Sequence, residues 1–178
     1  MNPVTILVIR SAARVFNPTL ASLKEEFPGS KVAVLAHESV APMLSQDPMV
    51  DEVLPLKSQE RISAFKYGPE NIRSLRTRKF DIAVSLYNIE RGLGYSNIDF
   101  LAWMSGAEQL RGYNCKGGFV ILTRNSIIKT YFREKMSTVW VVLNFLATII
   151  LFFLIALGMI FEWGFRKLFK QTFRPDAG

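Results

Sequence analysis

The 178-residue chain contains one cysteine, Cys115, and one histidine, His37. A single thiol excludes a disulfide within the chain and a metal site built from several cysteines, and it is compatible with a reducing compartment. No group of histidine and carboxylate residues has the spacing of metal ligands, so we expect neither a metal nor a cofactor. A lone histidine just after a strand is usually a loop or capping residue, and we favour that interpretation of His37 over a catalytic one.

The glycine-rich fingerprint of a nucleotide-binding Rossmann domain is also missing. Residues 10–16, after the first predicted strand, read RSAARVF and contain no glycine that would let the backbone approach a pyrophosphate. Residues 91–95 contain two glycines, which we interpret as turn formers. Ser11 has no histidine partner that would indicate a hydrolase triad. The carboxylates occupy ordinary capping or strand-edge contexts and form no evident catalytic pair: Asp51, Glu52, Asp81 and Asp99.

Positive charge is concentrated near the C-terminus. Residues 1–123 carry 14 Lys and Arg against 12 Asp and Glu, a net charge of +2, whereas residues 124–178 carry 8 against 3, a net charge of +5. The excess flanks an apolar run, where anionic lipid headgroups attract basic residues. The other basic group is interpreted as the solvated face of one helix rather than as a nucleic-acid surface, and it comprises Arg73, Arg76, Arg78 and Lys79.

The apolar run covers residues 139–161, which contain no charge and only Asn144 and Thr148 as clearly polar members. As a helix it would span about 34 Å, enough for a hydrocarbon core of about 30 Å. It shows no polar stripe of the kind that a buried helix of a soluble protein carries. The sequence therefore predicts one transmembrane helix with membrane lipid around it. The predicted anchors at the membrane interface are Trp140, Trp163, Arg133, Lys135, Arg166 and Lys167.

The orientation of this predicted span is less well specified by charge. Three basic residues precede the run and four follow it, so the positive-inside rule hardly discriminates. The N-terminus lacks the basic region and cleavage site of a signal peptide. We therefore expect the N-terminal domain in the cytoplasm and residues 162–178 as a basic tail across the membrane. Protection of the domain from protease in sealed inverted vesicles would contradict this topology.

One face of the predicted span has the composition of a helix–helix contact. Its residues follow a 4-3-4-3 spacing and share one side of the helix: Asn144, Thr148, Leu151, Ile155 and Gly158. Small and polar residues in such a stripe let helices approach closely and exchange hydrogen bonds in lipid. The alternative is that a lone Asn and Thr are simply tolerated. We favour helix–helix contact with other membrane-protein subunits, because an unpaired amide in hydrocarbon is strongly unfavourable.

Residues 1–123 alternate between strand and helix patterns. Apolar, β-branched runs predict strands over residues 5–9, 31–36, 50–55, 80–86, 110–113 and 119–122. Helices are predicted over residues 18–27, 41–45, 69–79 and 98–104, the first with Asn17 as N-cap and Pro18 as its first residue. Residues 57–68 show no clear period, and residues 124–138 read as a juxtamembrane helix or linker. This alternation predicts an α/β fold: a single Rossmann-like parallel-sheet domain followed by one transmembrane helix.

Several segments, in this order, resemble the N-terminal half of glycosyltransferase family 9, the ADP-heptose:lipopolysaccharide heptosyltransferases. They are ILVIR at residues 6–10, PTLASLKEEFPGSKVAVLAHESVAPML at 18–44, DPMVDEVLPL at 47–56, LRTRKFDIAVSL at 75–86 and MSGAEQLRGYN at 104–114. The resemblance implies a domain that faces an acceptor glycan and, because these enzymes make lipopolysaccharide, a bacterial inner-membrane location. Members of the family have a second Rossmann-like domain that binds the nucleotide sugar, and here the predicted span stands where that domain would begin.

The resemblance also exposes a departure in the loop after the first strand. The family pattern there reads roughly R-x-S-A-x-G-D, with the aspartate as the proposed general base. Between Arg10 and Pro18 this chain is shorter and has neither the glycine nor the aspartate. Arg14 lies near the expected position of the base, and a cation cannot accept the proton of a hydroxyl at neutral pH. Ser85 stands where family members commonly have an acidic residue at the end of the fourth strand.

Three functions are compatible with these observations. The leading hypothesis is a pseudoenzyme, with no catalytic residue, that serves as an accessory subunit of a larger membrane complex. The alternative is the acceptor-binding half of a split glycosyltransferase, whose nucleotide-sugar domain is a separate chain; the resemblance then places acceptor-cleft candidates at Arg10, Ser11, Arg14, Asn88 and Arg91. Each of these residues can also be read as a solvated strand-end residue. The third is a gene remnant or a truncated membrane enzyme with no partner.

Overall fold

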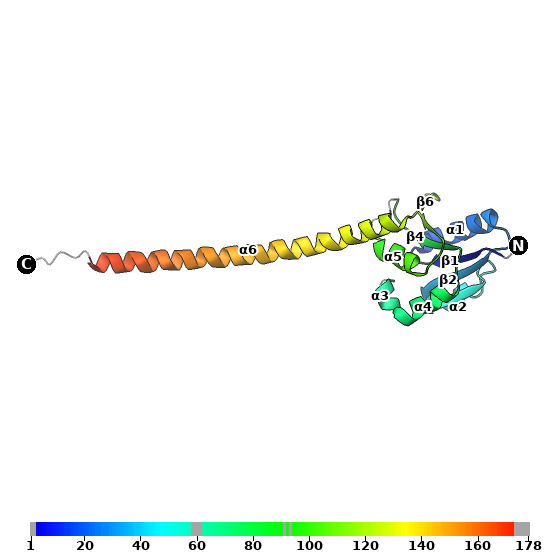
Figure 1. The fold of residues 1–178 in the computed structure, drawn as a ribbon, viewed down its shortest axis with the longest axis horizontal. Helices are drawn as coiled ribbons and strands as arrows, with labels where there is room; N and C mark the ends of the chain where they lie inside the picture. Colours follow the sequence, from blue (N-terminus) through cyan, green and yellow to red (C-terminus); the bar gives the residue numbers. More distant parts are fainter. Residues whose placement is uncertain (1–2, 58–61, 91, 93, 173–178) are drawn as a thin grey trace, which may run out of the picture. The chain divides into compact units, whose positions relative to one another are not determined.

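The computed structural model describes residues 3–57, 62–90, 92 and 94–172 and divides the chain into two compact units, Met1–Glu134 and Lys135–Gly178. The first unit is built around a six-stranded sheet with the order β3-β2-β1-β4-β5-β6 (Figure 1). Its strands are β1 (Thr5–Ile9), β2 (Lys31–His37), β3 (Glu52–Leu56), β4 (Ile82–Leu86), β5 (Gln109–Tyr113) and β6 (Phe119–Ile121). The predicted α/β fold with a Rossmann-like sheet is confirmed.

Five of the strands are parallel, as predicted, and β6 is the exception. It pairs with β5 in antiparallel orientation, Arg111 opposite Ile121 and Tyr113 opposite Phe119. Only residues 114–118 connect the two strands, which is too short for a crossover and long enough for a hairpin turn. Asn114 closes that turn, because its side-chain oxygen accepts hydrogen bonds from the backbone N–H groups of Lys116 and Gly118. The expectation of a wholly parallel sheet is wrong at this edge.

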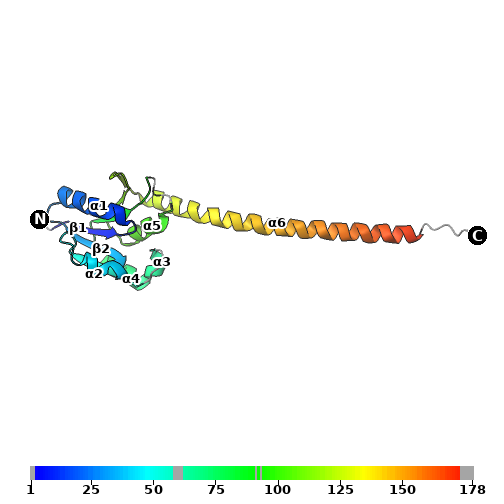
Figure 2. The ribbon, with the colours of Figure 1, turned by 180° about the vertical axis from the view of Figure 1, so that it is seen from behind.

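Helices cover both faces of the sheet. The helical segments are α1 (Ala13–Glu26), a 3-10 turn η1 (Glu38–Val40), α2 (Ala41–Leu44), α3 (Ala64–Tyr67), α4 (Pro69–Thr77), α5 (Ser96–Met104) and α6 (Arg124–Thr172). Helix α1 lies on one side of the sheet and α4 on the other (Figures 1 and 2). Each face has its own buried core: one formed around Ile6, Val8 and Leu20, the other around Leu7, Leu101 and Ile72. The central strands are apolar on both faces for this reason.

Helix α1 starts five residues earlier than the sequence pattern predicts. Its first residue is Ala13, its N-cap is Ala12 without a side-chain hydrogen bond, and Pro18 lies inside the helix. The predicted N-cap at Asn17 is therefore wrong. Pro18 lacks the N–H that would bond the carbonyl of Arg14, but burial of Val15, Phe16 and Leu20 against the sheet compensates for the missing bond.

Strand β3 forms one edge of the sheet, and it continues past Pro55 to Leu56 rather than ending at the proline. The predicted strand over residues 50–55 is thus shifted by two residues at its start and by one at its end. A proline is tolerated there because an edge strand has one side without a neighbouring strand. Pro55 pairs with Ala36 of β2 in the parallel ladder.

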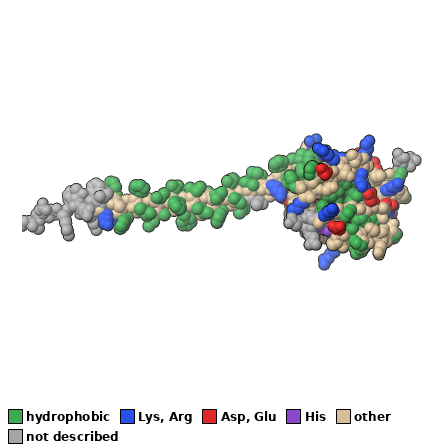
Figure 3. All heavy atoms as spheres, turned by 90° about the horizontal axis from the view of Figure 1, so that it is seen from below, with side chains coloured by type: hydrophobic (Ala, Val, Ile, Leu, Met, Phe, Trp, Pro, Cys, Tyr) green, Lys and Arg blue, Asp and Glu red, His purple; other side chains and the backbone are tan. Residues whose placement is uncertain are grey.

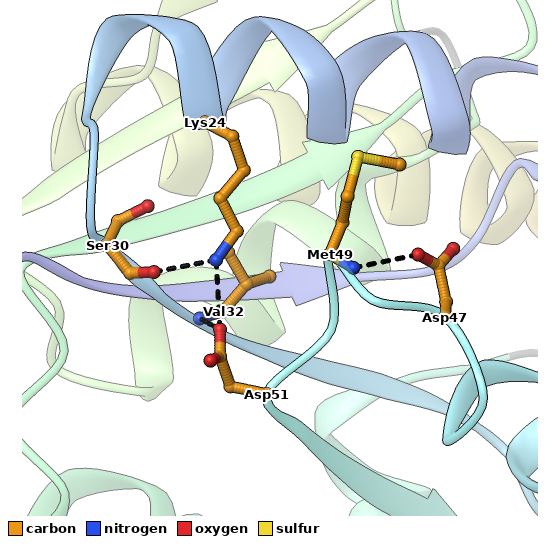
Figure 4. A network of polar contacts seen from close by, with 6 residues as sticks. All are labelled: Lys24, Ser30, Val32, Asp47, Met49 and Asp51. Atoms are coloured by element: carbon orange, nitrogen blue, oxygen red, sulfur yellow. Dashed lines mark hydrogen bonds and ion pairs between the residues drawn. The ribbon is translucent and has the colours of Figure 1, made fainter.

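Two carboxylates accept hydrogen bonds from residues at the N-terminal ends of the parallel strands β1 and β2. Asp51 accepts hydrogen bonds from the backbone N–H of Val32 at 2.7 Å and from Lys24 Nζ at 3.0 Å, and Lys24 Nζ also donates to the Ser30 carbonyl (Figure 4). Asp81 likewise accepts from the N–H and hydroxyl of Thr5. Burial opposes the ionisation of Asp51, but the N–H of Val32 and the Lys24 ammonium outweigh it, so the pKa of Asp51 is lowered. These contacts confirm the structural interpretation of Asp51 and Asp81.

The second unit consists of the rest of helix α6, which is continuous from Arg124 to Thr172. Its stretch Arg124–Lys167 is the one helix among the described residues that is long and apolar enough to cross a membrane. Hydrophobic side chains line it in Figure 3. The described part of the predicted basic tail, residues 162–172, is helical too. Near that end, Arg166 pairs with Glu162 and the Lys167 ammonium lies 5.1 Å from the Trp163 ring centre.

Within the predicted packing face, the hydroxyl of Thr148 donates to the backbone carbonyl of Asn144 at 2.8 Å. That hydroxyl is therefore satisfied inside the helix, as is common for Thr in apolar helices. Leu151 and Ile155 are exposed, and a Cβ on Gly158 would meet no atom within 4 Å. Trp140 and Trp163 are exposed as well. Contact of this face with another helix, and the roles of the interface anchors, stay predictions.

Candidate binding cleft

A cleft of about 270 Å³ lies at the carboxyl edge of the parallel strands. Its floor is formed by residues that follow β1, and its far wall by the loop and helix that follow β4. The strand order reverses between β1 and β4, because β2 and β3 lie on one side of β1 while β4 and β5 lie on the other. In open α/β sheets, ligands bind in the crevice at this switch point. The described residues lining it are Arg10, Ser11, Ala13, His37, Ile62, Gly94, Tyr95, Asn97 and Ile98.

Arg10 and Ser11 enter the cleft directly after β1. The hydroxyl of Ser11 donates to the carbonyl of Leu86 at the end of β4, at 2.5 Å, which ties the two central strands together. The guanidinium of Arg10 lies 5.4 Å from the Phe16 ring centre, and its buried Nε has no hydrogen-bond partner among the described residues. Burial lowers the pKa of the Arg10 guanidinium from its ordinary value, but an arginine remains protonated at neutral pH.

Helix α1 and strand β2 add to the positive character of the cleft. Ala13, the first residue of α1, lines the cleft, and no side chain caps the start of this helix and no acidic residue lies in its first turn. The positive end of a helix dipole favours an anion. His37 is the last residue of β2 and the N-cap residue of η1, which agrees with its interpretation as a capping residue, and it also lines the cleft. The cleft thus offers cationic and neutral donors to a ligand.

Of the acceptor-cleft candidates, the structure brings Arg10 and Ser11 together. Arg14 is exposed on α1 and is not among the lining residues, because one further step around the helix turns it away from Ala13. Asn88 is exposed, and its backbone N–H donates to the hydroxyl of Tyr95 at 3.3 Å. Arg91 lies outside the described residues. Gly94, Tyr95 and Asn97 were missed because nothing in the sequence separates cleft residues from turn residues after β4.

No Asp or Glu is present among the described residues that line the cleft. The family-like loop after β1 supplies Arg10, Ser11 and Ala13 to it instead of an aspartate. A general base for a sugar hydroxyl must come within hydrogen-bond reach of that hydroxyl, and histidine and carboxylate side chains serve in this role. Of these, the described lining offers only His37. The arrangement can hold an anionic or polyhydroxyl ligand, and its described lining lacks a carboxylate.

A second pocket, of about 310 Å³, lies between β5, β6 and the first turns of α6. It contains Asp99, which is only 7% exposed and accepts a hydrogen bond from the hydroxyl of Tyr87 at 2.5 Å. Burial raises the pKa of Asp99 from 3.8 to about 6; the donors Tyr87 and Ser85 lower it, and the nearby Glu134 carboxylate raises it. The predicted capping or strand-edge context of Asp99 is wrong, because α5 turns this residue into the core.

Two glycines hold the Tyr87 ring in this pocket. A Cβ on Gly112 would lie 2.3 Å from the Tyr87 hydroxyl, and a Cβ on Gly92 would lie 3.0 Å from its ring. Gly92 and Gly94 both have positive φ, +64° and +81°, which confirms their interpretation as turn formers. Glu134 of α6 then fastens the same loop, since it accepts hydrogen bonds from the Gly94 N–H at 2.8 Å and from the Ser96 hydroxyl.

The sheet order, the crossovers and the cleft at the switch point define the first unit as a Rossmann-like domain. No family model matches the chain. Lipopolysaccharide heptosyltransferase 3 of Escherichia coli is 31% identical over 71 residues, which are 39% of this chain and 21% of that protein. The chain thus spans about a fifth of the length of this curated relative.

The solved structures that are similar to the chain include two glycosyltransferases. The glycosyl transferase family 9 structure from Veillonella parvula DSM 2008 has a TM-score of 0.50 and 20% identity, covering 64% of this chain and 33% of that one. The structure of E. coli ADP-heptose lps heptosyltransferase II has a TM-score of 0.47 and 20% identity, covering 64% and 31%. The chain therefore carries a partial glycosyltransferase-family-9-like domain, which confirms the resemblance read from its segments.

Proposed function

We propose that this protein is a membrane-anchored accessory subunit with a glycosyltransferase-like domain that does not itself transfer sugar. The observation that carries the proposal is the cleft at the switch point, where Arg10, Ser11 and His37 face the ligand space and no described lining residue is a carboxylate. Glycosyl transfer requires an activated donor held beside an activated acceptor hydroxyl, and much of the rate acceleration comes from holding the two in place. Helix α6, long and apolar enough to cross a membrane, supports the anchored form.

Activity of the purified full chain tests the non-catalytic part of this proposal. The protein, in nanodiscs, is mixed with ADP-heptose and a lipopolysaccharide-core acceptor, and both ADP release and acceptor mass are measured. We expect no turnover above the rate of nanodiscs without protein. Sugar transfer by the chain alone, abolished by His37→Ala, would refute the proposal and would assign His37 as the base.

Sizing of the complex tests the accessory role. The protein is extracted from its native membrane in mild detergent, and its mass is measured by native mass spectrometry. We expect a complex larger than the 20.2 kDa chain, and Gly158→Ile should dissociate it, because a bulky residue separates closely packed helices. Phe153→Ile is the matched control, since nine residues of helix place Phe153 about half a turn from Asn144. A lone monomer would contradict the accessory role.

A second candidate function is the acceptor-binding half of a split glycosyltransferase. It is favoured by Arg10, which lines the cleft beside the N-terminus of α1 and whose buried Nε has no hydrogen-bond partner among the described residues. Phosphate groups on a lipid-linked glycan fit such a site, because guanidinium groups bind phosphate through paired hydrogen bonds. A separate chain would then supply the nucleotide-sugar site and the base.

Matched arginine variants distinguish this second candidate from the first. Binding of a phosphorylated lipopolysaccharide-core glycan is measured by calorimetry for the native chain, Arg10→Gln and Arg14→Gln. We expect Arg10→Gln to weaken binding at least tenfold and Arg14→Gln, which removes the same charge outside the cleft, to leave it within twofold. Thermal unfolding of both variants checks that Arg10→Gln remains folded. Equal affinities for all three proteins would eliminate the acceptor-binding role.

A further inference from the structure

The first unit has an apolar groove whose described lining residues are all different from those of the cleft. A cavity of about 420 Å³ opens between α3, α4 and α5 and is lined by Ala64, Phe65, Pro69, Ile72, Phe100 and Met104. Its volume falls within the range of about 300–1,000 Å³ that is usual for ligand pockets. Phe65 is 76% exposed, although its ring lies parallel to that of Phe100 with centroids 6.4 Å apart. An exposed aromatic ring that continues the apolar lining of a groove forms a contiguous apolar surface, and such surfaces are typical of contact sites.

The rim of the groove is basic. Arg73 and Arg76 of α4 line it, and both are exposed. Arg76 is held in place by a hydrogen bond from its Nε to the Met104 carbonyl at 2.9 Å. No acidic residue is present among the described residues of the lining. The aliphatic part of an arginine side chain can cover an apolar surface while its guanidinium group stays in water. Such a side chain suits the boundary between the hydrocarbon and the phosphate groups of a membrane.

The groove is connected through its wall to the start of α6. The ring of Phe100 stacks on Tyr131 with centroids 4.7 Å apart, and Tyr131 belongs to the first compact unit. Eight residues lead from Tyr131 to Val139, where the uncharged apolar run begins. Chain length alone therefore keeps Tyr131 within about 28 Å of that run, even for a fully extended segment. An anchored protein would hold the groove close to lipid headgroups at all times.

We propose that this groove docks the domain onto the anionic phospholipid surface of its own membrane, with Phe65 in the acyl region and Arg73 and Arg76 on lipid phosphates. This inference rests on the proposed membrane anchoring and adds a second point of attachment. The composition of the groove identifies the occupant: an apolar floor takes the lipid chain, and two exposed arginines take its charge. A tether alone leaves the domain free to turn, whereas docking fixes which face meets the bilayer.

A dye at the groove tests the docking. The full chain carries Cys115→Ser and Phe65→Cys, labelled with an environment-sensitive fluorophore, in nanodiscs of phosphatidylcholine with or without phosphatidylglycerol. We expect a brighter, blue-shifted emission in the anionic nanodiscs, quenched by spin-labelled lipid. The matched control carries the label at Met43→Cys, an exposed apolar position on α2, and should show neither effect.

Charge variants with equal net charge complete the test. Arg73→Ala and Arg76→Ala should each lower the ratio of docked to undocked protein about fivefold, the effect of one basic residue near an anionic surface. Arg78→Ala removes the same charge from the end of α4, outside the groove, where Arg78 pairs with Glu52, and it should leave the ratio within twofold. Emission that is insensitive to lipid charge, or equally sensitive to all three substitutions, would overturn the proposal.

Failure of docking and failure of anchoring give different results. Quenching of Trp140 and Trp163 by brominated lipid reports insertion of α6 independently of the dye. If brominated lipid quenches the tryptophans but spin-labelled lipid does not quench the dye, docking is refuted and anchoring is left intact. A dye that is shielded only when a protein partner is added, and never by lipid, would identify the groove as a protein interface and likewise refute the lipid proposal.

Discussion

The buried carboxyl of Asp99 makes a quantitative prediction about the pH dependence of stability. Its pKa in the folded domain is raised from 3.8 to about 6, chiefly by burial. A raised pKa means that the folded state binds the proton more tightly than the unfolded state. The associated stabilisation is fully present below the unfolded pKa and is lost as the pH rises through the folded pKa. A shift of roughly two pKa units changes the contribution of this carboxyl to the free energy of unfolding by on the order of 3 kcal/mol.

The perturbation that isolates this contribution is Asp99→Asn. The asparagine side chain keeps an oxygen that accepts the hydrogen bond of the Tyr87 hydroxyl, but it carries no charge at any pH. The difference in free energy of unfolding between the variant and the native chain should therefore rise in favour of the variant between about pH 4 and pH 7, by about 3 kcal/mol, and then level off.

Denaturant unfolding of the full chain in mild detergent measures this difference, with Trp103 fluorescence as the probe. Both proteins carry Trp140→Phe and Trp163→Phe so that the signal comes from the domain. Glu134→Gln provides an internal check: since the Glu134 carboxylate raises the pKa of Asp99, its removal should move the transition to lower pH. A stability difference that is constant between pH 4 and pH 8, or that favours the native chain as the pH rises, would refute the reasoning.

Three further predictions concern the packing of the domain. Gly112→Ala places a methyl group 2.3 Å from the Tyr87 hydroxyl and should lower the free energy of unfolding by about 1–3 kcal/mol in a denaturant titration. Gly118→Ala is the control, because its methyl group would lie 3.5 Å from the nearest neighbour, and it should be nearly neutral. The hydrogen bonds donated by Thr5 lower the pKa of Asp81. The stabilisation from this carboxylate is therefore present above the unfolded pKa and is lost as the pH falls through the folded pKa. Thermal unfolding across pH should show Asp81→Asn to be less stable than the native chain at pH 7 and equally stable in acid. Leu101→Ala, at a fully buried position of α5, should cost about 2–5 kcal/mol, and a value below 1 kcal/mol would contradict the assignment of this residue to the core.

The central sheet could be predicted from the sequence because its signal is local. Strands β1, β2 and β4 are short runs of β-branched and aliphatic residues, which is what burial on both faces requires. The long apolar part of α6 was predictable for the same reason. The start of α1 was not, since Ala12 carries no capping side chain and Pro18 gives a false start signal. There the packing of Val15 and Phe16 against the sheet decides where the helix begins.

The cleft was only partly predictable. Arg10 and Ser11 could be assigned to it because residues after the first strand of such a sheet always reach its carboxyl edge. The position of His37 was predictable on the same principle, but a single histidine gives no pattern that distinguishes a ligand from a cap. The burial of Asp99 and the groove beside Phe65 depend on contacts between α3, α5 and residues far away in the chain. Such contacts leave no periodic signal in the sequence.

Both outer edges of the sheet are poor templates for another strand. At one edge, Pro55 interrupts the row of backbone donors of β3, and at the other β6 ends after three residues, Phe119–Ile121. Unpaired backbone donors and acceptors at a sheet edge can pair with the edge strand of another copy and so join two sheets. Pro55 in β3 and the short length of β6 therefore disfavour such edge-to-edge pairing between copies of this domain.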